Sequence, residues 1–399
     1  MVVTFVSNYI NHHQLPFCEA MKSIGEDIEF YFVQTMPMEE KRVSMGWAVD
    51  ERALSYVVLY YEDEGRAGEL IENSDVVLFG WTDNLISDIQ RKRLSSGKLS
   101  FVVSERIYRE GQWKFISPRG LLNKYREHFV YRHSNVYLLC TGAYVASDFN
   151  LIKSYPGKML RWGYFPDASG VVKKTSPGAA YKDKIRLCWA GRLIDLKHPE
   201  FAVKIAAHLK RSKRLFSMDI VGDGPLRPFL EDMVKREELS EFVSFKGAMP
   251  PGEVLGVMDE ADIFLFTSNY LEGWGAVVNE AMERGCAVVA SIEAGAVPFL
   301  IEDNVNGLVY KNGSYDDFEK KVDHLFENRQ KIGIFAQAAQ MTIKSLWNAK
   351  NAAGELVRFS REVLAKKEAL PADRGPMSRA DIIKAPGFFR TLQEKNHLE

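Results

Sequence analysis

The chain has 399 residues, 46% of them hydrophobic, so it can bury a sizeable core, and its length suggests two domains. Its 52 Lys and Arg residues nearly balance 53 Asp and Glu residues, giving a formal net charge of -1. A charge so close to zero excludes a global field that would draw the protein onto DNA or RNA. We therefore expect no nucleic-acid partner, and any attraction to anions must be local.

The cysteines show no spacing typical of a metal site or a disulfide framework, and each lies in an apolar neighbourhood. Free buried thiols fit a reducing compartment. The N-terminal stretch MVVTFVSNYINHHQ lacks the pattern of a secretory signal, and no apolar stretch approaches the ~18 residues needed to span a bilayer. We expect a cytoplasmic protein, and peripheral attachment to the cytoplasmic face of the inner membrane stays open.

Short apolar runs recur along the chain, and each is followed by a segment long enough for a helix. The N-terminal half contains VVTFVS, IEFYFV, DVVLFGW, LSFVVS and VYLLC, and the C-terminal half contains IRLCWAG, SMDIVGDG, FVSFKG, DIFLFTS, CAVVAS and GLVY. Continuous rather than alternating apolar runs are typical of strands that helices cover on both faces. The pattern predicts an α/β protein with two doubly wound parallel sheets.

The apolar periodicity stops at residues 161–184, where Gly, Pro, Ser and Lys take over. We predict an N-terminal domain over residues 1–164, a linker over 165–183 and a second domain over 184–345. Residues 346–370 are predicted to form one long helix. This helix could pack back on the N-terminal domain. A weakly structured tail follows over 371–399.

The loops after the strands of the second domain carry the chemistry, because ligands of open parallel sheets bind at the carboxyl ends of strands. After IRLCWA comes GRLIDLK, which places Arg192 and Lys197 before an amphipathic helix. Two cations beside a helix N-terminus suit a doubly charged anion. From this loop alone, two solvated surface cations are the alternative interpretation.

The turn VGDGP follows the next strand and contains Gly222 and Gly224. It lacks the third glycine of the dinucleotide fingerprint, and no segment matches the P-loop pattern. A Rossmann dehydrogenase and a P-loop NTPase are therefore both disfavoured.

The segment NYLEGWGAVVNEAMERG follows the strand DIFLFTS and places Glu272 before, and Glu280 within, a predicted helix. Gly273 and Gly275 let backbone amides approach a ligand at the positive end of that helix. Ala276 leaves room one turn before Glu280, whose carboxylate can accept two hydroxyl hydrogen bonds from a vicinal diol such as a ribose. For Glu280 alone, a solvated helix glutamate is the alternative.

Five motifs together closely resemble retaining glycosyltransferases of family 4, and they cover the second domain in the right order. They are GRLIDLK, IVGDGPL, FKGAMP, ADIFLFTS and EGWGAVVNEAMERGCAVVASIEAGAVPFLIEDNVNGLVY. The resemblance implies the GT-B fold, in which two Rossmann-like domains face across a cleft. The N-terminal domain, residues 1–164, would bind the acceptor, and the C-terminal domain, residues 184–345, would bind the nucleotide sugar. It also implies transfer of a sugar from a nucleotide diphosphate sugar to a glycan or lipid-linked acceptor, with retention at the anomeric carbon and without a metal or other cofactor.

The resemblance also implies roles for single residues. Arg192 and Lys197 would hold the donor diphosphate, Glu272 the donor sugar and Glu280 the nucleoside ribose, which makes Arg192, Lys197 and Glu272 the predicted catalytic set. The predicted donor-binding residues are Gly191, Gly222, Gly273, Trp274, Gly275, Ala276 and Glu280. Trp274 replaces the phenylalanine that is commoner in the family.

The N-terminal domain matches the family less closely. Its first strand ends in SNYINHHQLPF, where Asn11, His12 and His13 could hydrogen-bond acceptor or donor groups. We do not expect the two histidines to bind a metal, because adjacent side chains rarely point together. Another strand exit carries Ser104, Glu105 and Arg106, where members of the family often have a histidine near the donor sugar.

Residues 105–134 carry seven Arg and Lys against three Glu, interleaved with aromatic residues. This mixture suits the interface of an anionic membrane, and a solvated helical face over buried aromatics is the alternative. The acidic segment YEDEG at 61–65 is expected to begin a helix rather than to bind a metal.

Two other classes stay open: a nucleotide-sugar epimerase or phosphorylase of the same fold, and a non-catalytic partner subunit. The residues do not identify the nucleobase, the donor sugar or the acceptor.

Overall fold

The computed structural model describes residues 1–44, 49–82, 85–165, 184–311 and 313–386. The chain forms two compact units, one of Met1–Asp167 with Leu346–Glu399 and one of Ala168–Ser345. The predicted linker, apart from Phe165, lies outside the described residues. No helix in the described ranges combines the length and apolar character needed to cross a bilayer.

The N-terminal unit is built on a seven-stranded parallel sheet in the order β3-β2-β1-β4-β5-β6-β7. Its strands are β1 (Val2–Ser7), β2 (Glu29–Gln34), β3 (Val57–Leu59), β4 (Val76–Phe79), β5 (Ser100–Ser104), β6 (Val136–Thr141) and β7 (Met159–Trp162). Its helices are α1 (Leu15–Ser23), α2 (Glu40–Ser44), α3 (Glu64–Asn73), α4 (Ser87–Ser95), α5 (Pro118–Glu127), α6 (Val145–Leu151) and α14 (Ala349–Leu364). Short 3-10 turns lie at Glu51–Ala53, Gln112–Ile116 and Phe129–Tyr131.

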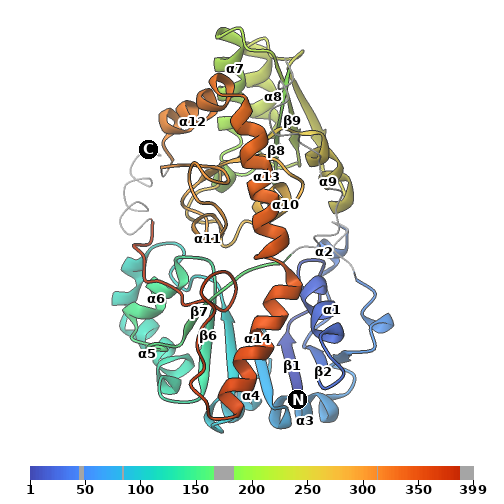
Figure 1. Ribbon diagram of the computed structural model, residues 1–399, viewed down its shortest axis with the longest axis vertical. Coiled ribbons are helices and arrows are strands. Elements are labelled where there is room, and N and C mark those ends of the chain that lie inside the picture. The colour runs from blue at the N-terminus through green and yellow to red at the C-terminus, as the bar shows by residue number, and fades with distance from the viewer. Residues whose placement is uncertain (45–48, 83–84, 166–183, 312, 387–399) are drawn as a thin grey trace. The chain divides into compact units, whose positions relative to one another are not determined.

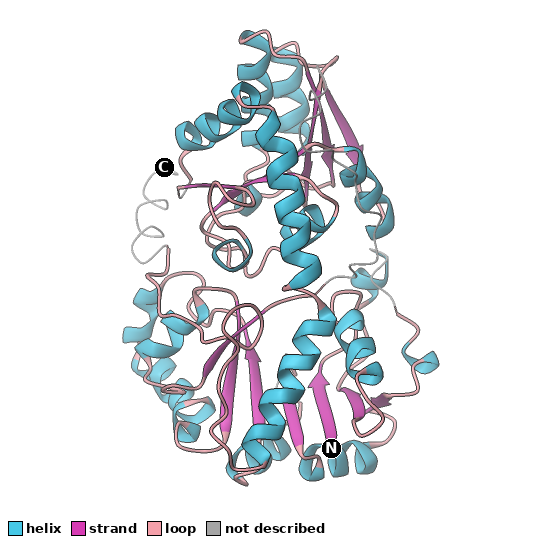
Figure 2. Ribbon diagram, in the orientation of Figure 1, coloured by secondary structure: helices cyan, strands magenta, loops and turns pink. Residues whose placement is uncertain are grey.

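The second unit is built on a six-stranded parallel sheet in the order β10-β9-β8-β11-β12-β13. Its strands are β8 (Ile185–Ala190), β9 (Phe216–Val221), β10 (Val243–Gly247), β11 (Ile263–Phe266), β12 (Ala287–Ser291) and β13 (Leu308–Tyr310). Its helices are α7 (Glu200–Arg211), α8 (Arg227–Arg236), α9 (Pro251–Glu260), α10 (Val277–Glu283), α11 (Val297–Leu300), α12 (Tyr315–Glu327) and α13 (Gln330–Ser345), with a 3-10 turn at Asp195–Lys197. Figure 2 shows the strands of each unit side by side with helices around them. The prediction of two doubly wound parallel sheets is confirmed.

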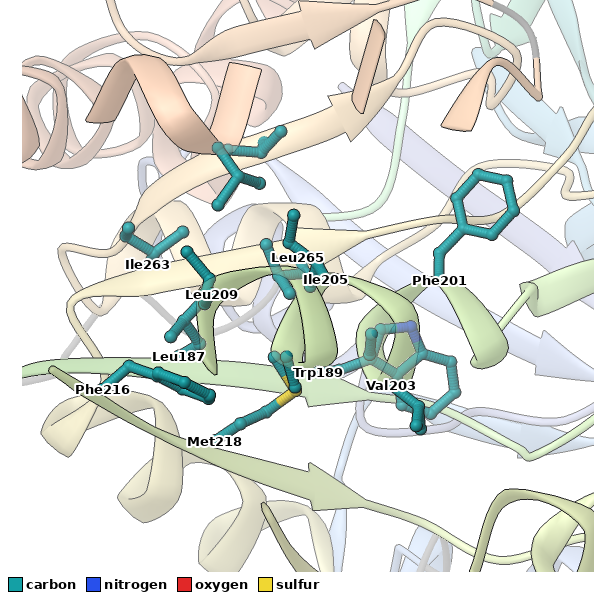
Figure 3. Packing of buried hydrophobic residues seen from close by; sticks show 14 of the residues in the cluster. Leu187, Trp189, Phe201, Val203, Ile205, Leu209, Phe216, Met218, Ile263 and Leu265 are labelled. Carbon is teal, nitrogen blue, oxygen red and sulfur yellow. The ribbon is translucent and has the colours of Figure 1, made fainter. Parts of the chain in front are cut away.

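Helix α7 shows how the sequence builds the second core. Its residues Phe201, Ile205 and Leu209 recur at the helical spacing and are all buried. They meet strand residues such as Leu187 and Leu265 in one continuous cluster (Figure 3). Burying a large apolar side chain stabilises a fold by about 1.5–3 kcal/mol, so this cluster fixes the strands whose ends form the site below.

The single helix predicted over 346–370 is present but shorter at both ends. Helix α13 ends at Ser345, and α14 begins only at Ala349 because the side chain of Asn348 caps it by accepting a hydrogen bond from the Asn351 amide. Helix α14 ends at Leu364 and packs beside α1 (Figure 1).

The segment after residue 370 also differs from the weakly structured tail that we expected. The backbone of residues 377–380 pairs with β7, where the Arg161 amide donates to the Ser378 carbonyl at 2.7 Å and the Ala380 amide donates to the Met159 carbonyl at 3.0 Å. An edge strand exposes unpaired backbone groups, and the tail satisfies them.

The predicted helix start at YEDEG is confirmed, and a glycine ends α10. The YEDEG segment leads into α3, whose N-cap Asp63 accepts a hydrogen bond from the Arg66 amide at 2.9 Å. Gly285 follows α10 with a φ of 69°, the left-handed conformation of a C-terminal glycine cap.

The turn after β9 packs backbone against backbone on the loop after β8. A Cβ atom on Gly222, whose φ is 124°, would lie 1.9 Å from the Gly191 carbonyl oxygen, and one on Gly224 would lie 2.5 Å from the Leu193 carbonyl oxygen. The Gly191 amide donates to the Val221 carbonyl at 3.0 Å. The glycines are therefore needed to bring the two loops together.

We predict that Gly222→Ala destabilises the second unit by about 3 kcal/mol or more, because both the backbone conformation and the missing space oppose a side chain. For a unit of this size, that loss lowers the thermal midpoint by roughly 6–12 °C in calorimetry. The control is Gly256→Ala, an exposed position in α9 with no atom within 4 Å of the added Cβ. This control should be neutral or slightly stabilising, and an equal loss in both variants would contradict the account.

Candidate functional site

The exit loops of β8 and β11 meet at the point where the strand order of the second sheet reverses. The Asn269 amide donates to the Leu196 carbonyl at 2.9 Å, which ties one loop to the other. The Thr267 hydroxyl accepts a hydrogen bond from the Trp189 indole at 2.8 Å and donates to the Lys197 carbonyl at 2.5 Å. The backbone of Lys197 is thus held from within the core.

Lys197 and Glu272 form an ion pair between these two loops, 75 residues apart in sequence. Their side chains are only 16% and 15% exposed. A partly buried pair is screened less by water and salt than a surface pair, so its charges act strongly on anything that binds beside it.

Glu280 lies in the first turn of α10, and its pKa is raised to about 7. Burial of the carboxyl group is the main cause; the charge of Arg284 lowers the pKa, that of Glu283 raises it and that of Lys197 lowers it again. The residue keeps a little accessible surface, but protein surrounds the carboxyl group closely enough to make its charge costly. Lys197 therefore acts on both predicted glutamates.

Arg192 lies on the same loop as Lys197, but its side chain is exposed. Within the described ranges, no hydrogen bond or ion pair engages its guanidinium group. The guanidinium group of Arg192 can therefore pair with an anion directly, whereas Lys197 is already paired with Glu272.

The Gly-Trp-Gly turn is fixed by its backbone. The Gly273 and Trp274 carbonyls accept hydrogen bonds from the Gly295 and Ala296 amides, both at 3.0 Å. Gly275 has a φ of 89°, and an added Cβ would lie 2.7 Å from the Phe266 ring. The turn therefore needs glycine at this position.

The Trp274 side chain is 1% exposed, and its indole donates to the Asn279 side-chain oxygen at 2.7 Å. Its ring packs in the core near Phe299, so only the backbone of Trp274 can face a ligand. Ala276 is the residue before α10 and is half-buried.

Four further polar side chains, those of His198, Glu200, Asn269 and Glu293, lie around this site and were not predicted. His198 has a φ of 47° and contacts the Asn269 side chain through Nε2 at 3.1 Å and Glu200 through Nδ1 at 2.8 Å. The buried carboxylate of Glu293 accepts a hydrogen bond from the Tyr270 amide at 3.2 Å. Asn269 and Glu293 lie within three residues of the ends of β11 and β12, and this position was the signal that could have found them.

The N-terminal unit contains a cavity of about 680 Å³ at the carboxyl ends of its strands. Five predicted residues line it: Asn11, His13, Ser104, Glu105 and Arg106. Glu105 accepts a hydrogen bond from the Tyr164 hydroxyl at 3.2 Å, and the Ser104 hydroxyl donates to the Glu105 carbonyl at 2.8 Å.

The two histidines lie closer together than we expected of adjacent residues, with ring centroids 3.9 Å apart. Burial lowers the pKa of both, and burial together with the charge of His12 lowers the pKa of His13 to about 3. Both imidazoles are therefore neutral at physiological pH. In the described ranges, the one cluster with metal-ligand geometry is His208, Glu319 and Asp323, away from both sites.

Arg106 lines the cavity, and its charge is paired within the protein. Its side chain is 3% exposed and forms two 3.2 Å hydrogen bonds with Asp148, which is fully buried. Asp148 also accepts hydrogen bonds from the Tyr108 amide at 3.0 Å and from Gln112 at 2.8 Å. This network fastens the segment after β5 to α6.

Comparison with known proteins connects this geometry to a family of enzymes. Residues 173–342 match the family described as Glycosyl transferases group 1. An uncharacterized glycosyltransferase of Methanocaldococcus jannaschii is 28% identical over 181 residues, which cover 44% of each chain. The amylovoran biosynthesis glycosyltransferase AmsK of Erwinia amylovora is 28% identical over 174 residues, or 42% of each chain. The match thus spans less than half the length of these two relatives.

Solved structures extend the similarity over both units. HepE of Anabaena, determined in complex with UDP, has a TM-score of 0.65 at 16% identity and covers 92% of this chain and 100% of its own. The lipopolysaccharide outer core galactosyltransferase WaaB has a TM-score of 0.61 at 15% identity, with the same coverage. At this identity the likeness concerns the fold, and the predicted GT-B fold is confirmed.

The raised pKa of Glu280 gives a prediction for stability. A carboxyl group whose folded pKa lies above its unfolded pKa favours folding at low pH, and that contribution is lost as pH rises from about 4.5 through about 7. We expect the uncharged variant Glu280→Gln to be more stable than the wild type at pH 8, by up to about 3 kcal/mol, and equally stable near pH 4.

Unfolding followed by calorimetry across this pH range measures the difference, with exposed Glu302→Gln as the control. A Glu280→Gln variant that is no more stable at pH 8 than the wild type would contradict the burial of this charge.

Proposed function

We propose that the protein is a retaining, metal-independent glycosyltransferase that moves a sugar from a nucleotide diphosphate sugar to a glycan or lipid-linked acceptor in the synthesis of a cell-surface polysaccharide. The observation that carries the proposal is the meeting of Lys197, Glu272 and Glu280 at the reversal point of the second sheet, beside the exposed Arg192. The match of residues 173–342 to Glycosyl transferases group 1 supports it, and so does HepE, whose solved structures hold UDP and UDP-glucose.

The Lys197–Glu272 pair suggests how the side chains of the site rearrange when the donor binds. A diphosphate is a stronger partner for an ammonium group than one carboxylate, so Lys197 would turn to the phosphates together with Arg192. Glu272 would then be released to accept hydrogen bonds from the donor sugar. Glu280 would accept two hydroxyl hydrogen bonds from the ribose, and the amides of the Gly-Trp-Gly turn would face the sugar and phosphates.

In the reaction, the bond between the anomeric carbon and the diphosphate oxygen breaks, and the acceptor oxygen bonds to the same face of that carbon. The acceptor proton passes to the departing phosphate oxygen. Negative charge grows on the diphosphate, and Arg192 and Lys197 offset it electrostatically. Two fixed cations can serve this purpose without a divalent metal, so we expect activity to survive chelation.

A donor panel tests the proposal. Uridine, guanosine and adenosine diphosphate sugars are incubated with a glycan acceptor, and release of the nucleoside diphosphate is measured with and without the acceptor. We expect acceptor-dependent release and an α-linked product from an α-linked donor by NMR. A changed donor sugar without diphosphate release would indicate an epimerase, and the absence of both would indicate a binding subunit.

Lys197→Ala should lower kcat/KM by roughly 100-fold, because loss of one contact to a transition-state charge costs about 3 kcal/mol. Lys246→Ala is the matched control, since it removes another lysine of the second unit and breaks an ion pair, with Asp219 at 3.1 Å. It should keep wild-type turnover. Equal activity of a folded Lys197→Ala variant would refute the role of Lys197.

We also propose that the enzyme works at the cytoplasmic face of an anionic membrane, docked through α5. No residue of α5 is buried, and Leu121, Leu122 and Tyr125 are 37%, 49% and 50% exposed. The exposed Ile116, at 67%, precedes this helix. Arg119 and Arg126 on the same helix are exposed and complement anionic headgroups, while Lys124 pairs with Glu127 at 2.6 Å.

We expect the protein to co-sediment with phosphatidylglycerol vesicles but not with phosphatidylcholine vesicles. Replacing both Leu122 and Tyr125 by serine should weaken this binding at least tenfold, because apolar area no longer enters the interface. Serine at both Leu215 and Phe229, which are 58% and 51% exposed in the second unit, is the control. Binding that is equal for both lipids, or equally weakened in the control, would contradict the proposal.

A further inference from the structure

The turn after β11 is organised by Asn269. The Asn269 carbonyl accepts a hydrogen bond from the Glu272 amide at 3.0 Å, and its side-chain oxygen accepts one from the Leu271 amide at 3.0 Å. The Asn269 amide donates to the Leu196 carbonyl at 2.9 Å, which fastens the turn to the loop after β8. The position of Asn269 therefore sets where the backbone of Glu272 lies.

The contacts of Asn269 also define where the ring proton of His198 lies. Because the side-chain oxygen of Asn269 accepts from the Leu271 amide, its side-chain nitrogen is the atom that lies 3.1 Å from His198 Nε2. That nitrogen can only donate, so His198 Nε2 accepts and the ring proton lies on Nδ1. Nδ1 lies 2.8 Å from Glu200 Oε1, to which it donates. The network therefore requires a neutral imidazole with its proton on Nδ1.

His198 makes these two contacts from a strained backbone conformation. Its φ of 47° and ψ of 52° lie in the left-handed region, which a glycine adopts without strain. Its side chain is 31% exposed, and its ring lies 5.6 Å from the Phe201 ring. Strained positions persist where the surroundings fix them, and they are commonest at functional sites. The conformation of His198 thus indicates that the imidazole, which follows Lys197 directly, has a role that glycine could not fill.

We infer that His198 is a positioning residue for Glu272. As a neutral imidazole oriented by Glu200, it holds the side chain of Asn269. Asn269 in turn holds Glu272 within reach of Lys197 and of a bound donor sugar. The inference rests on the proposed function, because it assigns a residue that orders the site of that reaction.

Nitrogen-15 NMR of the imidazole rings tests the network without any ligand. At pH 8 we expect His198 to carry its proton on Nδ1 and none on Nε2. His198→Gly keeps the left-handed backbone and removes only the imidazole, so it should shift the backbone amide signals of Leu271 and Glu272. His198→Gln should restore most of these shifts, because its side-chain oxygen can accept from Asn269 in place of Nε2.

Donor binding tests the positioning role. Calorimetric titration compares each nucleoside diphosphate with its sugar-bearing form: UDP with UDP-glucose, GDP with GDP-mannose and ADP with ADP-glucose. In His198→Gly we expect the sugar-bearing form to bind about tenfold more weakly and the free diphosphate to change by less than about threefold. The difference arises because Glu272 would contact the sugar, whereas Arg192 and Lys197 would contact the phosphates. His198→Gln should bind both forms nearly as the wild type does.

His208→Ala is the matched control. It removes another imidazole of the second unit that lies between carboxylates, with Asp323 at 2.9 Å and Glu319 at 3.4 Å. His208 lies on α7 and makes no contact with Asn269 within the described ranges. The control should leave the Leu271 and Glu272 signals and the affinities for both forms unchanged.

Three results would overturn the inference: a proton on His198 Nε2, unchanged Leu271 and Glu272 signals in His198→Gly, or an equal loss of affinity for a diphosphate and its sugar-bearing form. The outcome is separable from that of the proposed function. If no diphosphate or diphosphate sugar binds to the wild type, the function fails and the NMR measurements still decide the inference. If the donor binds and is turned over normally by His198→Gly, the function stands and the inference fails.

Discussion

The ion pair between Lys197 and Glu272 is the interaction on which the candidate site depends. It joins the exit loops of two neighbouring parallel strands, and it brings a cation within reach of two carboxylates. Each charged side chain can be this buried only because the other neutralises it, since burying an unpaired charge costs free energy. The pair therefore stabilises the loops when no ligand is bound. It also keeps an ammonium group and a carboxylate at the place where a ligand would bind.

The surrounding backbone makes this pair possible. Gly222 and Gly224 allow the loop after β9 to press against the loop after β8, and Thr267 holds the carbonyl of Lys197 from the core side. Gly275 lets the next turn pass close over the Phe266 ring. These contacts use backbone atoms and buried side chains, so they leave Arg192 exposed for a ligand.

The fold could be predicted because its central strands are buried on both faces and leave continuous apolar runs such as DIFLFTS. Strands β3 and β7 were missed: β3 has three residues and leads into the acidic YEDEG segment, and Arg161 interrupts the apolar run of β7. Helix α14 begins at Ala349 rather than at residue 346 because Asn348 caps it, a signal that one asparagine in a helical pattern gives only weakly. The pairing of residues 377–380 with β7 follows from an open sheet edge, which no local pattern reveals.

Some parts of the candidate site could likewise be predicted from the sequence, and others could not. The carboxyl ends of strands could be read from the sequence, so the loops that carry Lys197, Glu272 and Glu280 were found. The pairing of Arg106 with Asp148, 42 residues away, could not be predicted, because only tertiary packing brings the two side chains together. The N-terminal contact residues could likewise be placed beside a cavity only once the sheet was known.

The central claim is that the second unit grips a nucleoside diphosphate through its phosphates and its ribose. Calorimetric titration with uridine, guanosine and adenosine diphosphates, and with the corresponding nucleosides, at pH 6 and pH 8 in chelator tests it most directly. We predict that one diphosphate binds far more tightly than its nucleoside, and that it releases a proton at pH 6 as the carboxyl group of Glu280 ionises against the ribose. Nucleosides that bind as tightly as their diphosphates, or no binding by any of them, would contradict the account.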